Sequence, residues 1–153
     1  MEQEGLNAIG QGFWPGYVGV VFTHVEPGET RAELPLAQHH MAPNGYIHAG
    51  VVVSLGDTCA GYGCVASLPD GAVGFTTVEL KTNFLASATE GTLQCVARAV
   101  HRGRRTQIWD AEVTHLETGR TLALFRCTQM ILYEDGRGTN TMDSLRPRPV
   151  KEE

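Results

Sequence analysis

Residues 49–68 form the segment that most constrains how this chain can fold. They are mostly apolar, and Asp57 is their one charged residue. They also include four glycines, which lower helix propensity, so packing against the rest of the protein must stabilise this segment. A carboxylate is costly to bury in such surroundings unless it has a hydrogen-bonding partner or a chemical task. We therefore expect a core helix from Ala49 to Ser67, with Asp57 either bonded to a neighbouring loop or helix or placed in a functional site.

The sequence on both sides of this helix has the character of half-buried β-strands, with alternating apolar and polar residues and turn signals between the stretches. The expected strands span residues 17–25, 30–36, 72–85, 92–100, 106–116 and 121–133. A single apolar helix cannot cover its circumference against a flat sheet, so the sheet must curve around it. The expected fold is α+β: a strongly curved antiparallel sheet wrapped around one long central helix, whose open side packs against a second subunit.

The expected domain borders follow from turn residues and composition. Residues 12–16, Gly-Phe-Trp-Pro-Gly, are expected to stop any helix that begins near the N-terminus. We therefore expect an N-terminal segment at 1–15 with little helix and a single domain at 16–134. Residues 135–153 are rich in Gly, Pro and charged side chains and are expected to form a flexible tail.

Composition and charge narrow the classes of function. The 153 residues carry a formal net charge of -5, which argues against a nucleic-acid-binding protein. The acidic start lacks the features of a signal peptide, and the glycines and polar residues within 49–68 argue against a membrane span. We therefore expect a cytoplasmic protein. The four cysteines form no CxxC pair or His/Cys cluster, so we interpret them as reduced core residues and expect no metal and no nucleotide cofactor.

Two short motifs, taken with the element order, suggest a family. Residues 44–50, Asn-Gly-Tyr-Ile-His-Ala-Gly, and 55–58, Leu-Gly-Asp-Thr, resemble the hotdog-fold acyl-CoA thioesterases, particularly the phenylacetic-acid-degradation (PaaI-like) type. The likeness covers about residues 16–133. That family has a His-Gly-Gly run at the start of its central helix and a carboxylate nine residues after the His, a spacing that His48 and Asp57 keep. The resemblance implies a hotdog fold, hydrolysis of an acyl-CoA substrate, and a homodimer or a dimer of dimers.

The helix start also has a physical case for acyl transfer. Free N–H groups there carry partial positive charge, so those of Ala49 and Gly50 can stabilise the oxyanion that develops on a thioester carbonyl. Asp57 lies about 12 Å further along the same helix, too far to act on that carbonyl. Antiparallel helices in a dimer bring Asp57 of one subunit to the helix start of the other, in agreement with the shared sites that the resemblance implies. Asp57 would then act as a general base or as a nucleophile.

Three further residues are candidates near the reacting group. His48 either orients the substrate or satisfies backbone groups of its loop. Asn44 corresponds approximately to an asparagine that precedes the His in related thioesterases, although here only four positions separate Asn44 from His48. Thr77 matches a family position whose hydroxyl holds the catalytic water, and threonine is also simply a good strand former.

Other residues are candidates for contacts with the CoA part of a substrate. Residues 74–85 resemble the family strand that flanks the thioester and pantetheine, and Lys81 and Asn83 are the substrate-binding candidates within it. Residues 101–105, His-Arg-Gly-Arg-Arg, are the one compact basic group in an acidic chain. Arg102, Arg104 and Arg105 therefore form either a clamp for the CoA phosphates or an ordinary solvated turn.

Two other functions stay open. A hotdog dehydratase or hydratase is the enzyme alternative, but the sequence has neither the Phe-Pro loop histidine nor the Asp-x-Asn-Pro-x-His pattern of those relatives. A non-catalytic acyl-CoA-binding module is the alternative outside enzymes. Asp57 argues against a pure binding role, so hydrolysis of an acyl-CoA or aryl-CoA thioester to the free acid and CoA is the expected function.

Overall fold

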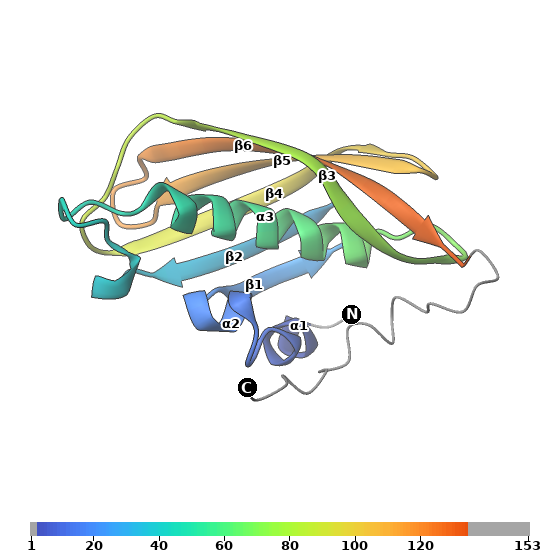
Figure 1. Ribbon diagram of the computed structural model, residues 1–153, viewed down its shortest axis with the longest axis horizontal. Helices are drawn as coiled ribbons and strands as arrows, with labels where there is room; N and C mark the ends of the chain where they lie inside the picture. Colours follow the sequence, from blue (N-terminus) through green and yellow to red (C-terminus); the bar gives the residue numbers. More distant parts are fainter. Residues whose placement is uncertain (1–2, 135–153) are drawn as a thin grey trace, which may run out of the picture.

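The computed structural model describes residues 3–134 and shows one curved sheet around one long helix (Figure 1). The elements are α1 (Gln3–Ile9), α2 (Trp14–Val18), β1 (Val21–Glu26), β2 (Glu29–Pro35), a 3-10 turn (Gln38–His40), α3 (Ala49–Ala66), β3 (Ala72–Phe84), β4 (Thr92–Arg102), β5 (Thr106–His115) and β6 (Thr121–Tyr133). All strand pairs are antiparallel, in the order β1-β2-β4-β5-β6-β3. The predicted α+β hotdog architecture is confirmed.

Glycines allow α3 to lie directly on the sheet. A Cβ atom added to Gly56 would lie 3.0 Å from the ring of Phe125 on β6, and one added to Gly63 would lie 2.6 Å from Trp109 on β5. Trp109 is fully buried, and its indole N–H donates to Gln107 Oε1 (2.9 Å). The low helix propensity of this segment is therefore offset by close packing of the helix backbone against large core side chains.

The N-terminal part of the chain departs from the sequence-based expectation. Residues 14–18 form α2 and do not begin a strand, so the first strand starts at Val21. The helix is possible because Pro15 lies in its first turn, where the missing N–H of proline has no partner to lose. α1 also packs on the sheet: Leu6 is buried, and the Asn7 side chain bonds both backbone groups of Phe22. The expected border at residue 16 falls inside α2, and the expected tail at 135–153 lies outside the described residues.

A β-bulge in β3 decides which side chains face α3. Thr77 pairs with Gln129, whose side chain is buried on the helix-facing side of the sheet. The register shifts between Thr77 and Glu79, so the alternation is displaced by one residue. Lys81 then pairs with Arg126, and both point to the outer face. Thr77 consequently lies on the α3 side of the sheet, whereas Lys81 lies on the opposite side.

Candidate active site

The start of α3 has one capping bond and one available amide. His48 is the N-cap residue, and its Nδ1 accepts from the N–H of Gly50 (2.9 Å). The N–H of Val51 donates to His48 O (3.0 Å). Within residues 3–134 the N–H of Ala49 has no hydrogen-bond partner. The expectation for Gly50 is therefore corrected, because its N–H is taken up by the cap, and Ala49 supplies the free donor.

The capping bond also fixes which nitrogen of the neutral His48 ring carries the proton. Because Nδ1 accepts a hydrogen bond, the neutral imidazole carries its proton on Nε2. His48 is exposed, so this Nε2–H is accessible as a second donor next to the Ala49 amide. The two roles predicted for His48 from the sequence are thus compatible. One ring nitrogen accepts a backbone hydrogen bond, while the other can donate to a substrate.

A buried histidine anchors the loop that leads to this helix start. His40 Nδ1 accepts from the N–H of Ala37 (3.0 Å), so its Nε2–H donates to Val18 O (2.7 Å). Burial is the main cause that lowers the pKa of His40 below its ordinary value. The N–H of His48 donates to His40 O (2.9 Å), which ties the cap residue to this anchor.

Asn44 lies in the same loop and shapes its turn. Its Oδ1 accepts from the N–H of Tyr46 (3.2 Å), a local bond typical of an Asx turn. An open hollow of about 560 Å³ adjoins it, lined by Ala42, Asn44, Tyr46, Ile47, His48, Ala49 and Ser87. The structure thus brings three sequence-predicted residues, Asn44, His48 and Ala49, to one hollow.

Asp57 occupies an unusual position on α3. It is half-buried, and its Oδ1 is shielded from solvent and has no hydrogen-bond partner within the described chain. Burial raises the pKa of this carboxyl above its ordinary value. The carboxyl lies near Cys127 on β6. The pKa of the Cys127 thiol is raised to about 12, mainly by burial and to a smaller extent by the charge of Asp57. Eight residues of helix, about 12 Å, separate Asp57 from Ala49, so one protomer does not bring the two groups together.

Two polar side chains that the sequence did not single out lie on the helix-facing side of β3 and β6. Thr82 pairs with Phe125, the ring that contacts Gly56, and Thr82 Oγ1 is buried with no hydrogen-bond partner in the part of the chain that the structure describes. Gln129 is fully buried and donates to Cys127 Sγ (3.3 Å), and its Oε1 has no hydrogen-bond partner among residues 3–134. The signal available for the second of these was a glutamine among the alternate positions 123–131 of the strand, whose other members are apolar. Thr77, the neighbour of Gln129 in the sheet, is exposed.

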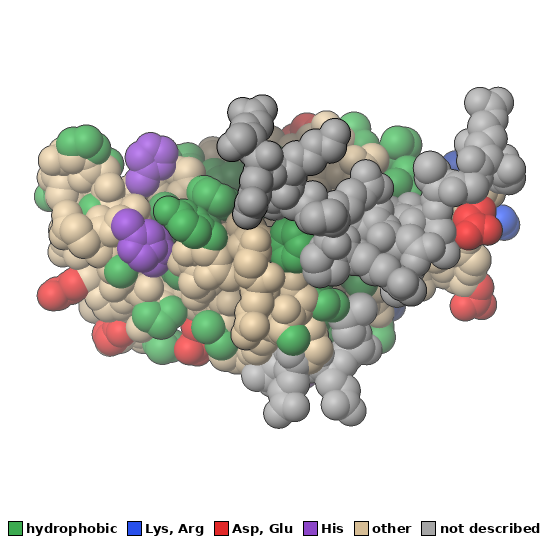
Figure 2. All heavy atoms as spheres, turned by 60° about the horizontal axis from the view of Figure 1, so that its bottom comes forward, with side chains coloured by type: hydrophobic (Ala, Val, Ile, Leu, Met, Phe, Trp, Pro, Cys, Tyr) green, Lys and Arg blue, Asp and Glu red, His purple; other side chains and the backbone are tan. Residues whose placement is uncertain are grey.

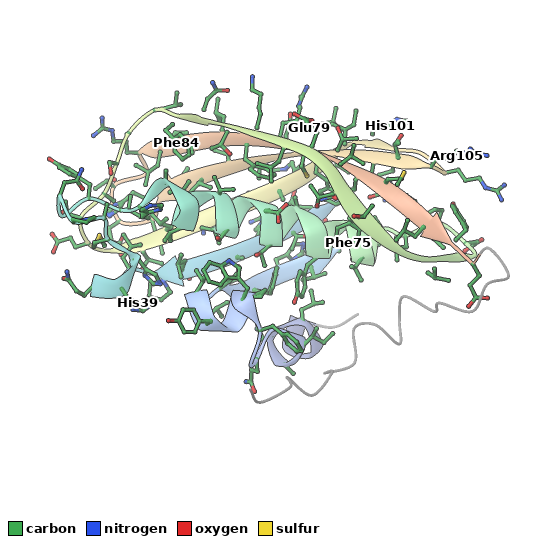
Figure 3. All side chains as sticks on the ribbon, in the orientation of Figure 1. His39, Phe75, Glu79, Phe84, His101 and Arg105 are labelled. Carbon is green, nitrogen blue, oxygen red and sulfur yellow. The ribbon has the colours of Figure 1, made fainter. Side chains whose placement is uncertain are left out.

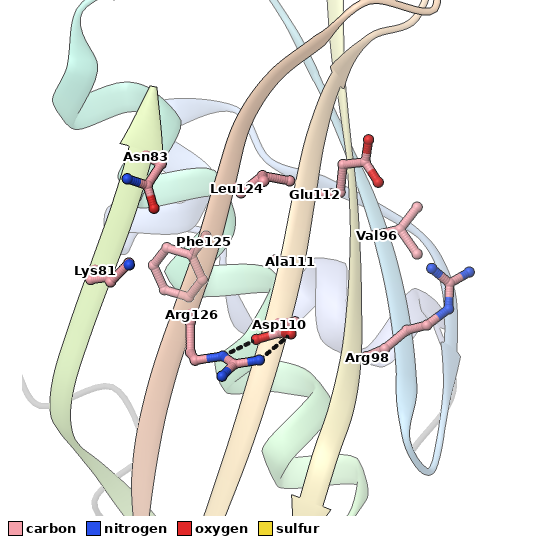
Figure 4. Close-up of a pocket in the computed structure, with 10 residues that line it drawn as sticks. All are labelled: Lys81, Asn83, Val96, Arg98, Asp110, Ala111, Glu112, Leu124, Phe125 and Arg126. Carbon is pink, nitrogen blue, oxygen red and sulfur yellow. Dashed lines mark hydrogen bonds and ion pairs between the residues drawn. The ribbon is translucent and has the colours of Figure 1, made fainter. Parts of the chain in front are cut away.

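The predicted substrate contacts in β3 lie elsewhere. Lys81 and Asn83 line a hollow of about 630 Å³ on the outer face of the sheet, beside the ion pair of Asp110 and Arg126 (Figure 4). The sheet stands between this hollow and α3. The bulge turns both residues away from α3 of their own protomer, and their contact with the CoA part of a substrate stays a prediction.

The basic turn divides into two parts. Arg104 lies over the Tyr133 ring (5.5 Å to its centroid), and Arg104 and Arg105 line an open hollow of about 690 Å³. Figure 3 shows Arg105 at the end of the sheet remote from His39. The Arg102 guanidinium instead approaches the β1–β2 turn, 3.6 Å from the position of a Cβ on Gly28. Two of the three predicted arginines thus share one hollow.

Within residues 3–134 no group of three or more His, Cys, Asp or Glu side chains is arranged to hold a metal ion, and all four cysteines are free and buried. α3 is long and apolar enough to cross a membrane by length and hydropathy, and half of it is buried within the fold. Its packing against all six strands of the sheet is that of a core helix.

The hotdog fold and the free amide at the start of α3 together define a class of protein, and comparison of the sequence with known families identifies that class. Residues 44–123 match the Thioesterase superfamily, and the chain belongs to that family. The chain is thus a thioester hydrolase with a hotdog fold.

Two relatives agree with the family assignment, and a solved structure agrees with the fold. The chain is 33% identical over 111 residues to a 1,4-dihydroxy-2-naphthoyl-CoA hydrolase of Listeria monocytogenes, covering 72% of this chain and 89% of the relative. An Escherichia coli protein of the same name is 32% identical over 132 residues, 84% of this chain and 93% of the relative. The crystal structure of a variant of thioesterase PA1618 from Pseudomonas aeruginosa superposes with a TM-score of 0.81 at 24% identity, covering 86% and 94% of the two chains.

Proposed function

We propose that this protein hydrolyses an acyl-CoA or aryl-CoA thioester in a site shared by two protomers. The N–H of Ala49 polarises the thioester carbonyl, and Asp57 of the partner subunit supplies the carboxylate. One observation carries the proposal. Among residues 3–134, a buried carboxylate oxygen of Asp57 and the helix-start amide of Ala49 both lack a hydrogen-bond partner, and they lie about 12 Å apart on the same helix. Two antiparallel copies of α3 are therefore needed to bring them together.

The surface of the protomer supports such a pairing. β3 is an edge strand of 13 residues, and its Val78, Leu80 and Phe84 side chains are exposed. A long apolar edge of this kind is a template for pairing with another strand. The start of α3 is also left uncovered, because Ala49 and Gly50 are exposed. A second copy that continues the sheet at β3 would cover both features, and a dimer of such dimers is the corresponding larger assembly.

The chemistry follows from these groups. The carbonyl oxygen accepts from the Ala49 N–H, at the positive end of the α3 dipole, so negative charge is stabilised as it develops. In the general-base route, Asp57 takes a proton from water, and the oxygen attacks the carbonyl carbon. The C–S bond then breaks, CoA leaves as a thiolate and takes up a proton, and the free acid is released. In the alternative route, Asp57 attacks the carbon itself, the C–S bond breaks, and CoA leaves as a thiolate that takes up a proton. Water then hydrolyses the resulting mixed anhydride, which releases the free acid and restores the Asp57 carboxylate.

Several residues are assigned supporting roles. The His48 Nε2–H is a second donor for the substrate, and Asn44 holds the loop that carries it. Thr77 is proposed to hold the attacking water, and its place on the α3 side of the sheet supports this role. Arg104 and Arg105 share a hollow at the end of the sheet and are proposed to pair with CoA phosphates, since guanidinium groups match phosphate oxygens. No cofactor besides the CoA ester is required for these steps, and a cytoplasmic location stays a prediction.

The test is a panel of CoA esters assayed for released thiol, with Asp57→Asn protein as the matched control. We expect wild-type turnover on at least one aryl or medium-chain ester and loss of most of that turnover in the variant. Binding of the esters without thiol release would favour the acyl-CoA-binding module. Loss of enoyl absorbance from an unsaturated ester, again without thiol release, would favour a hydratase.

A further inference from the structure

An aromatic residue lines the hollow next to the free amide of Ala49. Tyr46 precedes Ala49 by three residues, and both line the open hollow of about 560 Å³ at the start of α3. Ser87, which follows the end of β3 by three residues, lines it as well. The hollow therefore lies between the loop before α3 and the end of β3, the edge strand at which a second protomer is proposed to join.

The backbone of Tyr46 is held in place while its side chain is free. The Ala42 N–H donates to Tyr46 O (2.7 Å), and the Tyr46 N–H donates to Asn44 Oδ1 (3.2 Å). The following N–H, that of Ile47, donates to Ala88 O (2.9 Å). Tyr46 is 53% exposed, and among residues 3–134 its ring stacks on no other aromatic ring. A ring on a fixed backbone with much of its surface open is suited to bind another ring, because little freedom is lost on binding.

The lining of this hollow suits an uncharged group. Besides Tyr46 it consists of small or aliphatic side chains and uncharged polar or imidazole side chains, and among the described residues that line it none is Lys, Arg, Asp or Glu. Figure 2 shows histidine side chains at the end of the molecule where α3 begins, whereas the Lys and Arg side chains visible on this face lie toward the other end. A partly apolar hollow with a few polar groups is typical of a site for a small organic group.

The two ends of the substrate have different places in the proposed site. The CoA phosphates are assigned to Arg104 and Arg105, whose hollow shares no residue with the one at Ala49. The acyl group is therefore the part left for the hollow at Ala49. In a benzoyl ester the ring is attached directly to the carbonyl carbon, so a carbonyl oxygen held about 2.9 Å from the Ala49 nitrogen leaves that ring in the hollow that Tyr46 lines.

We propose that Tyr46 is a specificity-determining residue whose ring binds the aromatic ring of the acyl group, so that the protein favours aryl-CoA over aliphatic CoA esters. The inference rests on the proposed function, since it takes a carbonyl at the Ala49 amide as its reference point. Tyr46 takes no part in the bond-breaking steps, so its removal changes the choice of substrate and leaves the chemistry to the groups already named.

The experiment compares kcat/KM for benzoyl-CoA and hexanoyl-CoA. Tyr46→Leu keeps an apolar side chain but removes the ring. We expect its benzoyl-to-hexanoyl ratio to fall roughly 2- to 12-fold, the range that a ring–ring contact supports, with hexanoyl-CoA changed less than about twofold. Tyr46→Phe keeps the ring and should retain most of the preference. Tyr17→Leu is the matched control, because Tyr17 is also exposed but does not line this hollow, and it should leave the ratio unchanged.

Ala42→Leu provides a second variant, which keeps the Tyr46 ring and fills part of the same hollow. It should lower kcat/KM for 2-naphthoyl-CoA more than for benzoyl-CoA, because the larger acyl group needs more of that space. An unchanged ratio in either variant would overturn the inference alone, as would equal losses on both esters or a wild type that prefers hexanoyl-CoA.

Two further outcomes are informative. A shift of Tyr46→Leu to a smaller assembly by light scattering would overturn the inference, since Tyr46 would then be a subunit contact. Wild-type protein that releases no CoA from either ester would contradict the proposed function, and this inference with it.

Discussion

Replacing Asp57 by Asn should separate catalysis from stability in this protein. Asparagine has nearly the same shape as aspartate but neither accepts a proton from water nor attacks a carbonyl at neutral pH. General-base catalysis contributes about 10²- to 10⁴-fold to rate, so kcat/KM should fall by at least about 10²-fold. CoA release from the best ester of the panel, followed with a thiol reagent, measures this directly.

The same substitution should leave the protein at least as stable as the wild type. Burial raises the pKa of Asp57, so the folded state favours the neutral carboxyl. The stability that the neutral Asp57 carboxyl contributes is therefore lost as pH rises through its folded-state pKa. At pH 7 the ionised carboxylate therefore lowers the free energy of unfolding, and the amide removes that penalty. Each 1 kcal/mol gained would raise Tm by roughly 2–4 °C in a protein of this size. A structural carboxylate would give the reverse pattern, with lower Tm and retained turnover, and that result would refute the reasoning.

Four further outcomes test other parts of the account. Ala49→Pro removes the free amide at a position where helices tolerate proline, so kcat should fall about 10²- to 10³-fold. Ala49→Ser keeps the N–H and is the control, and the two variants should have similar circular dichroism spectra and Tm. Replacing both Arg104 and Arg105 by Gln should raise KM for CoA esters more than for esters of a short thiol, and equal effects would remove the phosphate assignment. Gly63→Ala should destabilise the fold by about 1–3 kcal/mol in thermal unfolding, since the new Cβ would lie 2.6 Å from Trp109. Because the pKa of His40 is lowered in the folded state, neutral His40 contributes to stability above about pH 6.5, and this contribution is lost as the pH falls below that value. The Tm of the wild type should therefore decline below about pH 6.5, and His40→Gln should flatten that decline.

Much of the architecture could be predicted because the hydrophobic pattern changes period clearly. The helix was expected at 49–67 and forms at Ala49–Ala66, and five of the six strands lie close to their expected bounds. The exception is the start of the first strand. Pro15 and its flanking glycines were interpreted as helix breakers, but proline in the first turn of a helix is compatible with the helix that forms at Trp14–Val18.

The side-chain arrangement of the site was less accessible from sequence. In a regular strand, side chains alternate between the two faces, which would put Thr77, Lys81 and Asn83 on the same face. The bulge after Thr77 moves Lys81 and Asn83 to the other face. Sequence likewise showed two amides at the helix start, whereas the bond from Gly50 to His48 depends on the rotamer of the His ring.

The shared site is the central claim, and mixed dimers of Ala49→Pro and Asp57→Asn protomers test it most directly. If the Asp57 carboxylate of one protomer acts at the Ala49 amide of the other, each mixed dimer has one site with both defects and one site with none. A population in which protomers combine at random should then recover about one quarter of the wild-type turnover, although each variant alone is nearly inactive. Turnover of the mixture that stays at the level of the separate variants would contradict the account.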